Sequence, residues 1–293
     1  MFYLVAVILL NTLISGFFKL FNKYRINALQ AIVVNYWVCV ITGSIFLGKF
    51  TITSESIHTA WFPWSIFMGL YFVAIFNLIA YSTRINGITT TVISNKLSLV
   101  LPVAFSVLLY HDNLTLLKIA GIIMAFPAVY LTTRAKEEGH MQSIFWTVVL
   151  FFSSGFLDTL VKYVQQGYLT TPDTQAAYTI HTFAAAASFG TIFITLLVLL
   201  KKTQLAWRNI IAGIIVGIPN FFSIYWLIRM LNSNFLQSSA AIPINNIAIV
   251  ITTCLMAIIF FKEKLTTQRT IGLSLSIIAI LLIALADMNG SSI

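Results

Sequence analysis

The chain has 293 residues, of which 59% are hydrophobic and only 9% are charged, and its mean hydropathy is +0.94. A soluble protein of this length needs far more charge to cover its surface, so the composition excludes a soluble globular protein and indicates a polytopic membrane protein. The formal net charge of +9 comes from basic residues in short loops. There Lys and Arg orient helices and meet anionic lipid headgroups, so we do not expect a nucleic-acid partner.

Ten apolar segments have the length that a membrane-spanning helix needs. They cover residues 2–21, 27–47, 63–83, 88–109, 114–133, 143–164, 175–200, 207–229, 238–260 and 267–286. The first is longer than a signal-peptide core and lacks a small-residue cleavage site, so we expect it to be retained. The connections are too short to hold a domain. We therefore predict an all-α, multi-pass protein of the plasma membrane, which is the inner membrane in a bacterium.

The sequence repeats itself in order. Residues 91–121 match residues 242–272 at an offset of 151, so that Asn95 corresponds to Asn246. Three shorter matches precede this one along the two halves: 15–17 with 154–156, 43–46 with 190–193, and Arg84 with Arg229. Matches in the same order indicate a duplication. Five helices per copy is an odd number, which predicts two inverted five-helix repeats, residues 1–135 and 143–290, with a site near the membrane midplane.

A motif recurs at the end of each half. The first copy is Pro102-Val103, then Asp112-Asn113-Leu114-Thr115, then Gly121, and the second copy is Glu263-Lys264-Leu265-Thr266, then Gly272. Together with the duplication, this motif resembles the drug/metabolite transporter superfamily, of the EamA type with ten helices. The resemblance covers essentially the whole chain, although Asp112 stands where the family usually has Glu. It implies a carrier whose first, third, fourth, sixth, eighth and ninth helices surround a cavity, with the fifth and tenth at the periphery as a homodimer contact.

The basic residues also predict an orientation. Twelve of the 17 Lys and Arg residues lie at the connections after the first, third, fifth, seventh and ninth segments. Cytoplasmic loops carry the excess of Lys and Arg, so this count places both termini outside. Many EamA-type relatives have cytoplasmic termini, so the resemblance implies the opposite orientation.

Two ionisable residues lie inside apolar segments. Lys96 lies about 12 Å deep at 1.5 Å per helical residue, too far from the helix end to reach the membrane surface. Asp158 lies closer to the end of its segment. Ionisable residues inside a membrane are functional by default. We expect Lys96 to anchor a carboxylate or phosphate and Asp158 to couple transport, with a structural ion pair between the two as the alternative.

Further polar residues share helix faces with Lys96 or occupy related positions in the other segments. The predicted substrate-binding residues are Lys96, Asn95, Thr91, Asn245, Asn246, Asn35, Tyr36, His181, Asn220 and Trp226. The alternative for the Asn and Thr residues is hydrogen bonding between helices, and for His181 it is packing. Gly213 and Gly217 have the GxxxG spacing of a close helix contact.

Asp112 and Glu263 sit in tight turns after long helices, where a carboxylate stabilises the free N–H groups of a helix start. We assign them this structural role and no catalytic one. The chain has no nucleophile elbow, HExxH sequence or phosphate-binding loop, so we expect neither an enzyme nor a cofactor or metal. An intramembrane lipid-modifying enzyme and a channel stay as alternatives of other classes.

The sequence therefore predicts a secondary carrier that works by alternating access. Its substrate is a small polar organic metabolite, carboxylate-bearing and of the amino acid kind, and the direction is export. No nucleotide site is encoded, so the proton gradient or substrate exchange supplies the energy. A sugar, nucleotide-type or phosphorylated-metabolite exchanger is the alternative within transport.

Overall fold

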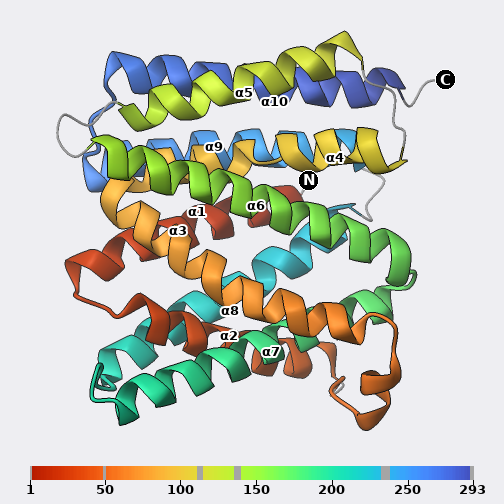
Figure 1. Ribbon diagram of the computed structural model, residues 1–293, viewed down its shortest axis with the longest axis vertical. Coiled ribbons are helices and arrows are strands. Elements are labelled where there is room, and N and C mark those ends of the chain that lie inside the picture. Colours follow the sequence, from red (N-terminus) through yellow and green to blue (C-terminus); the bar gives the residue numbers. More distant parts are fainter. Residues whose placement is uncertain (1, 49–50, 111–114, 135–139, 232–237, 291–293) are drawn as a thin grey trace. The chain divides into compact units, whose positions relative to one another are not determined.

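The computed structural model describes residues 2–48, 51–110, 115–134, 140–231 and 238–290, and these residues are almost entirely helical (Figure 1). The helices are α1 (Phe2–Lys23), α2 (Ala28–Leu47), the short 3-10 helix η1 (Ser54–His58), α3 (Phe62–Leu97), α4 (Val100–Tyr110), α5 (Leu116–Arg134), α6 (His140–Tyr168), α7 (Pro172–Leu199), α8 (Trp207–Leu231), α9 (Ser238–Phe261) and α10 (Thr267–Gly290). The predicted all-α class is confirmed for this part of the chain.

Nine helical stretches among the described residues are long and apolar enough to cross a membrane. Eight of them match predicted segments one to one. The third and fourth predicted segments, 63–83 and 88–109, fall together in one stretch, Phe62–Phe105. Its backbone leaves the helical conformation at Gly87, between the two predicted segments. A multi-pass membrane protein follows, whereas ten separate spans and an inverted repeat stay predictions.

The chain forms two compact units, each of which contains residues from both halves of the sequence. Unit 1 consists of residues 1–19, 81–159 and 223–293, and unit 2 consists of residues 20–80 and 160–222. Four helices, α1, α3, α6 and α8, are divided between the units. The two predicted repeats are stretches of sequence, and the compact units do not coincide with them.

In unit 1, α5 and α10 lie side by side, and glycines permit the close contact (Figure 1). A Cβ atom at Gly121 of α5 would lie 2.8 Å from the carbonyl oxygen of Ala279 in α10. A Cβ atom at Gly272 of α10 would lie 2.9 Å from the carbonyl oxygen of Ala128 in α5. Gly121 and Gly272, like Ala128 and Ala279, are 151 residues apart, so the same contact occurs twice with the two helices exchanged. An early residue of each helix meets a late residue of the other, and the pair is antiparallel.

Unit 2 contains a similar pair, α2 and α7. A Cβ atom at Gly43 of α2 would lie 3.4 Å from Cγ1 of Ile180, and one at Gly190 of α7 would overlap the side chain of Val33. These two contacts are related by an offset of 147 residues.

Two further helices pack on this pair, α8 on α2 and α3 on α7. At Gly217 of α8 a Cβ atom would lie 2.9 Å from the carbonyl oxygen of Asn35. A Cβ atom at Gly213 would lie 2.5 Å from both the carbonyl oxygen of Ala31 and Cβ of Val34. The packing role predicted for the GxxxG spacing is therefore confirmed. At Gly69 of α3 a Cβ atom would lie 2.9 Å from the carbonyl oxygen of Thr182, which is 147 residues after Asn35.

Candidate functional site

The best-defined polar site of unit 1 is built around the break in α3. Gly87 has φ 87° and ψ 172°, a left-handed conformation that residues with a Cβ atom rarely adopt. The break exposes the backbone N–H groups of Ile88 and Thr89, which begin the second half of the helix. Free N–H groups at a helix start need acceptors and carry the positive end of the helix dipole.

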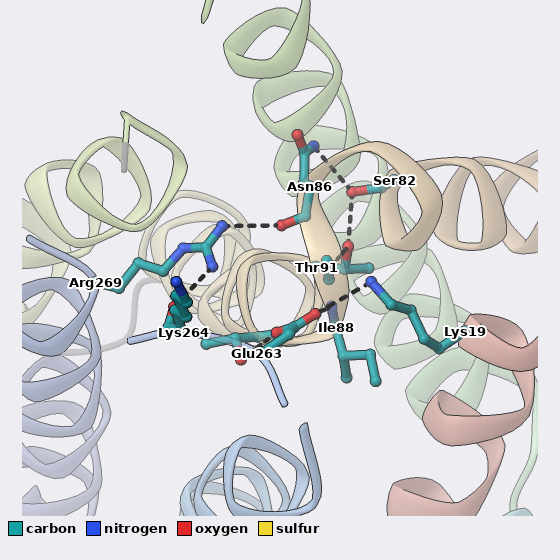
Figure 2. Close-up of polar contacts among 10 residues, drawn as sticks. Lys19, Ser82, Asn86, Ile88, Thr91, Glu263, Lys264 and Arg269 are labelled. Carbon is teal, nitrogen blue, oxygen red and sulfur yellow. Dashed lines mark hydrogen bonds and ion pairs between the residues drawn. The ribbon is translucent and has the colours of Figure 1, made fainter. Parts of the chain in front are cut away.

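Glu263, in the connection between α9 and α10, supplies these acceptors (Figure 2). One carboxylate oxygen accepts from the N–H of Ile88 at 2.8 Å and from the Lys19 ammonium at 3.4 Å. The other accepts from the N–H of Thr89 at 3.3 Å and from its hydroxyl at 2.9 Å. Burial by itself would raise the pKa of Glu263, but these hydrogen bonds and the Lys19 charge outweigh it, and the pKa lies below its usual value.

The predicted helix-start role of Glu263 is thus confirmed in kind, but the helix is not the one that follows it in sequence. The first turn of α10 is capped by Thr266, whose hydroxyl accepts from the N–H of Arg269 at 3.4 Å. Thr115 caps α5 in the same way, through the N–H of Lys118 at 3.3 Å. In both copies of the motif, therefore, the threonine serves the following helix. Asp112 lies outside the described residues.

A side chain at Gly87 would also displace the Glu263 carboxylate. A Cβ atom there would lie 2.5 Å from a carboxylate oxygen of Glu263, closer than real Cβ contacts. The glycine therefore has two functions, since it adopts the left-handed turn and it lets the carboxylate approach the backbone.

The first half of α3 ends at the break with a backbone carbonyl group that accepts a hydrogen bond from a cation. The guanidinium of Arg269 donates to the carbonyl oxygen of Asn86 at 3.3 Å and to that of Lys264 at 3.3 Å (Figure 2). Arg269 is buried, at 7% exposure. Carbonyl groups at a helix end carry the negative end of the dipole, so a cation is favourable there and an anion is favourable at Ile88. The α9–α10 connection, with Glu263, and the first turn of α10, with Arg269, thus bring one charge of each sign to the two ends of the broken helix.

Side chains join the two halves of α3 across the break. The hydroxyl of Thr91 donates to the carbonyl oxygen of Gly87 at 2.8 Å and lies 2.9 Å from the hydroxyl of Ser82. The amide of Asn86 donates to the Thr147 hydroxyl of α6 at 2.9 Å. The structure thus places Thr91, a predicted substrate residue, in a buried network within the protein.

Lys96 and Asp158 lie within the candidate spans of α3 and α6. Their opposite charges attract each other. Lys96 is half-buried and Asp158 is exposed. Both residues are described, and no ion pair within 4.0 Å joins them, so their charges act on each other over a longer distance.

The other predicted residues of unit 1 have different surroundings. Asn95 donates to the Ser154 hydroxyl of α6 at 2.9 Å, which is the helix–helix contact given as its alternative. Asn245 and Asn246 of α9 are buried, and Oδ1 of Asn245 has no hydrogen-bond partner among the described residues. The ring of Trp226 lies 5.6 Å from that of Phe2.

Four predicted residues belong to unit 2. Asn35 accepts from the Asn220 amide at 3.2 Å, so the structure brings these two together. Tyr36 is fully buried, and its hydroxyl donates to the carbonyl oxygen of Phe72 at 2.8 Å. Nδ1 of His181 lies 2.8 Å from the carbonyl oxygen of Ala177, one turn earlier in α7.

Sequence reasoning missed the network at the break, which uses Lys19, Ser82, Asn86 and Arg269. One signal was available, the Asn86-Gly87 dipeptide between two apolar segments, because Asn-Gly marks a turn. In the part of the chain that the structure describes, no group of three His, Cys, Asp or Glu side chains is placed to hold a metal ion.

Comparison with known proteins supports the family resemblance in the first half of the chain. Residues 3–134 match the EamA-like transporter family. The predicted resemblance is confirmed. This family is part of the drug/metabolite transporter superfamily, and with the nine apolar helical stretches the match indicates a multi-pass membrane transporter. An uncharacterised protein of Haemophilus influenzae is 26% identical over 286 residues, which cover 94% of this chain and 95% of that one.

A solved crystal structure shares the fold of this chain. It superposes with a TM-score of 0.60 over 98% of this chain and 97% of its own, at 14% sequence identity. At this identity the likeness concerns the fold alone.

Proposed function

We propose that this EamA-like protein is a secondary active transporter that exports a small polar metabolite bearing a carboxylate, such as an amino acid. The observation that carries the proposal is the charge arrangement within the spans of unit 1. Lys96 and Asp158 interact without forming an ion pair within 4.0 Å, and Lys96 is not fully buried. A charge inside a membrane costs at least about 2.5–3.5 kcal/mol unless it meets water or a partner. A substrate carboxylate is the partner that this lysine lacks.

In this proposal the two groups have different functions. Lys96 binds the substrate carboxylate, because an ammonium group is a compact donor for an anion. Asp158 either takes up a proton, which couples transport to the proton gradient, or binds the amino group of the substrate, which couples transport to exchange. Asn245, whose Oδ1 has no partner among the described residues, accepts a hydrogen bond from the substrate and so helps to select among carboxylates.

Alternating access between two inverted repeats is the mechanism we propose. The reciprocal glycine contacts support it. The α5–α10 contact and the α2–α7 contact each occur twice with the helices exchanged, and α3 packs on α7 as α8 packs on α2. Antiparallel pairs with exchanged contacts are expected when a two-fold axis runs perpendicular to the helices, which for spanning helices means an axis in the membrane plane.

We further propose that the protein resides in a bacterial inner membrane and forms a homodimer through α5 and α10. Both helices keep large apolar residues on their outer surfaces, with Ile123 of α5 at 63% exposure and Ile271 of α10 at 48%. In a membrane such residues face lipid or a second copy of the chain.

Transport assays with purified protein in liposomes test the proposal. Amino acids are compared with the amines that lack only the carboxylate, and we expect saturable uptake and counterflow for the acids alone. Equal uptake of acid and amine would contradict carboxylate binding. Preference for a phosphorylated sugar would favour the exchanger alternative, and flux without saturation would favour a channel.

A further inference from the structure

Two turns at one end of unit 2 form a single surface. The first joins α1 to α2 and the second joins α7 to α8, at residues 24–27 and 200–206. Both begin with the same backbone arrangement. In the first turn the N–H of Ile26 donates to the carbonyl oxygen of Phe21 at 2.8 Å, and in the second the N–H of Lys202 donates to that of Leu197 at 2.8 Å. These bonds end both helices in the Schellman manner.

An amide network locks the two turns together. The amide of Gln30 donates to the Thr203 hydroxyl and to the Gln204 carbonyl oxygen, both at 3.0 Å. The amide of Asn209 donates to the Gln30 side chain at 2.6 Å, and its oxygen accepts from the N–H of Asn27 at 3.0 Å. Gln30 and Asn209 are each 3% exposed. The turns are therefore held in a fixed relation by buried hydrogen bonds.

This paired-turn surface carries five exposed cations and no acidic residue. The cations are Lys23, Arg25, Lys201, Lys202 and Arg208. Arg25 and Lys201 occupy the left-handed position of their turns, with φ of 52° and 56°, where glycine is usual. The described acidic residues of unit 2, Glu55 and Asp173, lie at the opposite ends of α2 and α7.

Apolar and aromatic side chains accompany the cations. Tyr24 is 58% exposed, Leu205 66% and Trp207 73%. Trp and Tyr are typical of the headgroup level of a membrane, and the turns join helices that are long and apolar enough to cross one. We therefore infer that the surface lies at the level of the lipid phosphates. A soluble nucleic acid could approach this surface only from the aqueous side of the membrane.

We propose that the paired-turn surface is a binding site for the headgroup of an anionic phospholipid. The cations hold the headgroup phosphates, and Trp207 and Leu205 lie against the lipid chains. A cluster of four to eight basic residues next to spanning helices is typical of such recognition. The amide network adds what a loose basic loop lacks, because it presents cations from two separate turns in one arrangement.

The test is lipid binding by the full-length protein in nanodiscs of zwitterionic phosphatidylcholine to which phosphatidylglycerol is added. The variant is Lys201→Gln/Lys202→Gln, and the control is Lys262→Gln/Lys264→Gln. Both remove two exposed lysines, and Lys262, with φ of 51°, matches the left-handed Lys201. We expect the variant to bind phosphatidylglycerol about 25-fold more weakly, about five-fold for each cation. We expect the control to bind as the native chain does, and added salt to weaken native binding.

Three results would overturn the proposal. An equal loss in variant and control would mean that net charge, not a site, attracts the lipid. Equal binding of phosphatidylglycerol and phosphatidylcholine by the native chain would mean that the cations do not select the headgroup. Full competition by soluble glycerol phosphate or by a short oligonucleotide, at concentrations matching the lipid, would assign the surface to a soluble anion.

Asn209→Leu keeps all five cations but removes the central amide, and we expect it to weaken lipid binding while thermal unfolding stays cooperative.

Discussion

The contact between Glu263 and the broken helix can be tested by Glu263→Gln, which keeps the shape and removes the charge. The carboxylate accepts from two backbone N–H groups, one hydroxyl and one ammonium. The glutamine can accept with only one oxygen, so its NH2 group faces one of the N–H groups. A buried donor without an acceptor costs about 1–3 kcal/mol. The lost charge at the helix start costs about 0.3–2 kcal/mol more.

We therefore expect Glu263→Gln to destabilise the protein by about 3 kcal/mol, with thermal unfolding in detergent shifted down by several degrees. The matched control is Lys19→Gln. It removes the partner that is 28% exposed and leaves both N–H groups bonded, so we expect a loss of at most about 1 kcal/mol. A Glu263→Gln protein no less stable than Lys19→Gln would refute the capping role of the Glu263 carboxylate.

Three further predictions concern the same region and the topology. Because the pKa of Glu263 lies below its ordinary value of 4.5, the ionised carboxylate stabilises the folded protein at pH values above 4.5. We expect this stabilisation to disappear as the pH falls below 4.5 and through the lowered pKa. It is measured as the difference in melting temperature between the native protein and Glu263→Gln. Gly87→Ala would place a Cβ atom in a left-handed residue beside Glu263, and we expect a loss of at least about 1–2 kcal/mol, whereas an unchanged melting temperature would contradict the need for glycine. A cysteine at Gly139, outside the described residues, should resist impermeant thiol reagents added to whole cells if the Lys and Arg count gives the orientation, and labelling from outside would reverse it.

The fold class was predictable because membrane insertion depends on long apolar runs, which are local features of the sequence. The helix-packing glycines were partly predictable, since Gly213 and Gly217 have a recognisable spacing. The break at Gly87 falls between the third and fourth predicted segments, whose apolar runs end and begin on either side of it.

The contact of Glu263 was not predictable in the same way. It joins residues 175 positions apart, and it exists only because Gly87 frees the N–H groups that Glu263 binds. A capping residue is normally sought directly before the helix that it caps. This rule assigns Glu263 to α10, whose first turn is in fact capped by Thr266. The predicted substrate residues were chosen by polarity within apolar segments, a criterion that does not distinguish a hydrogen bond between helices, as at Asn95 and Ser154, from a group that meets substrate.

The most direct test of the proposed function is transport by Lys96→Met in liposomes, with melting temperature measured on the same preparation without substrate. We predict that transport of the carboxylate substrate is lost and that the melting temperature is unchanged or raised, because the substitution removes a cation that has no ion pair within 4.0 Å among the described residues. Lys162→Met in α6 is the control for removing a lysine from a span. Normal transport by Lys96→Met would contradict the account. A loss of about 3–5 kcal/mol in stability would instead identify a structural ion pair with Asp158.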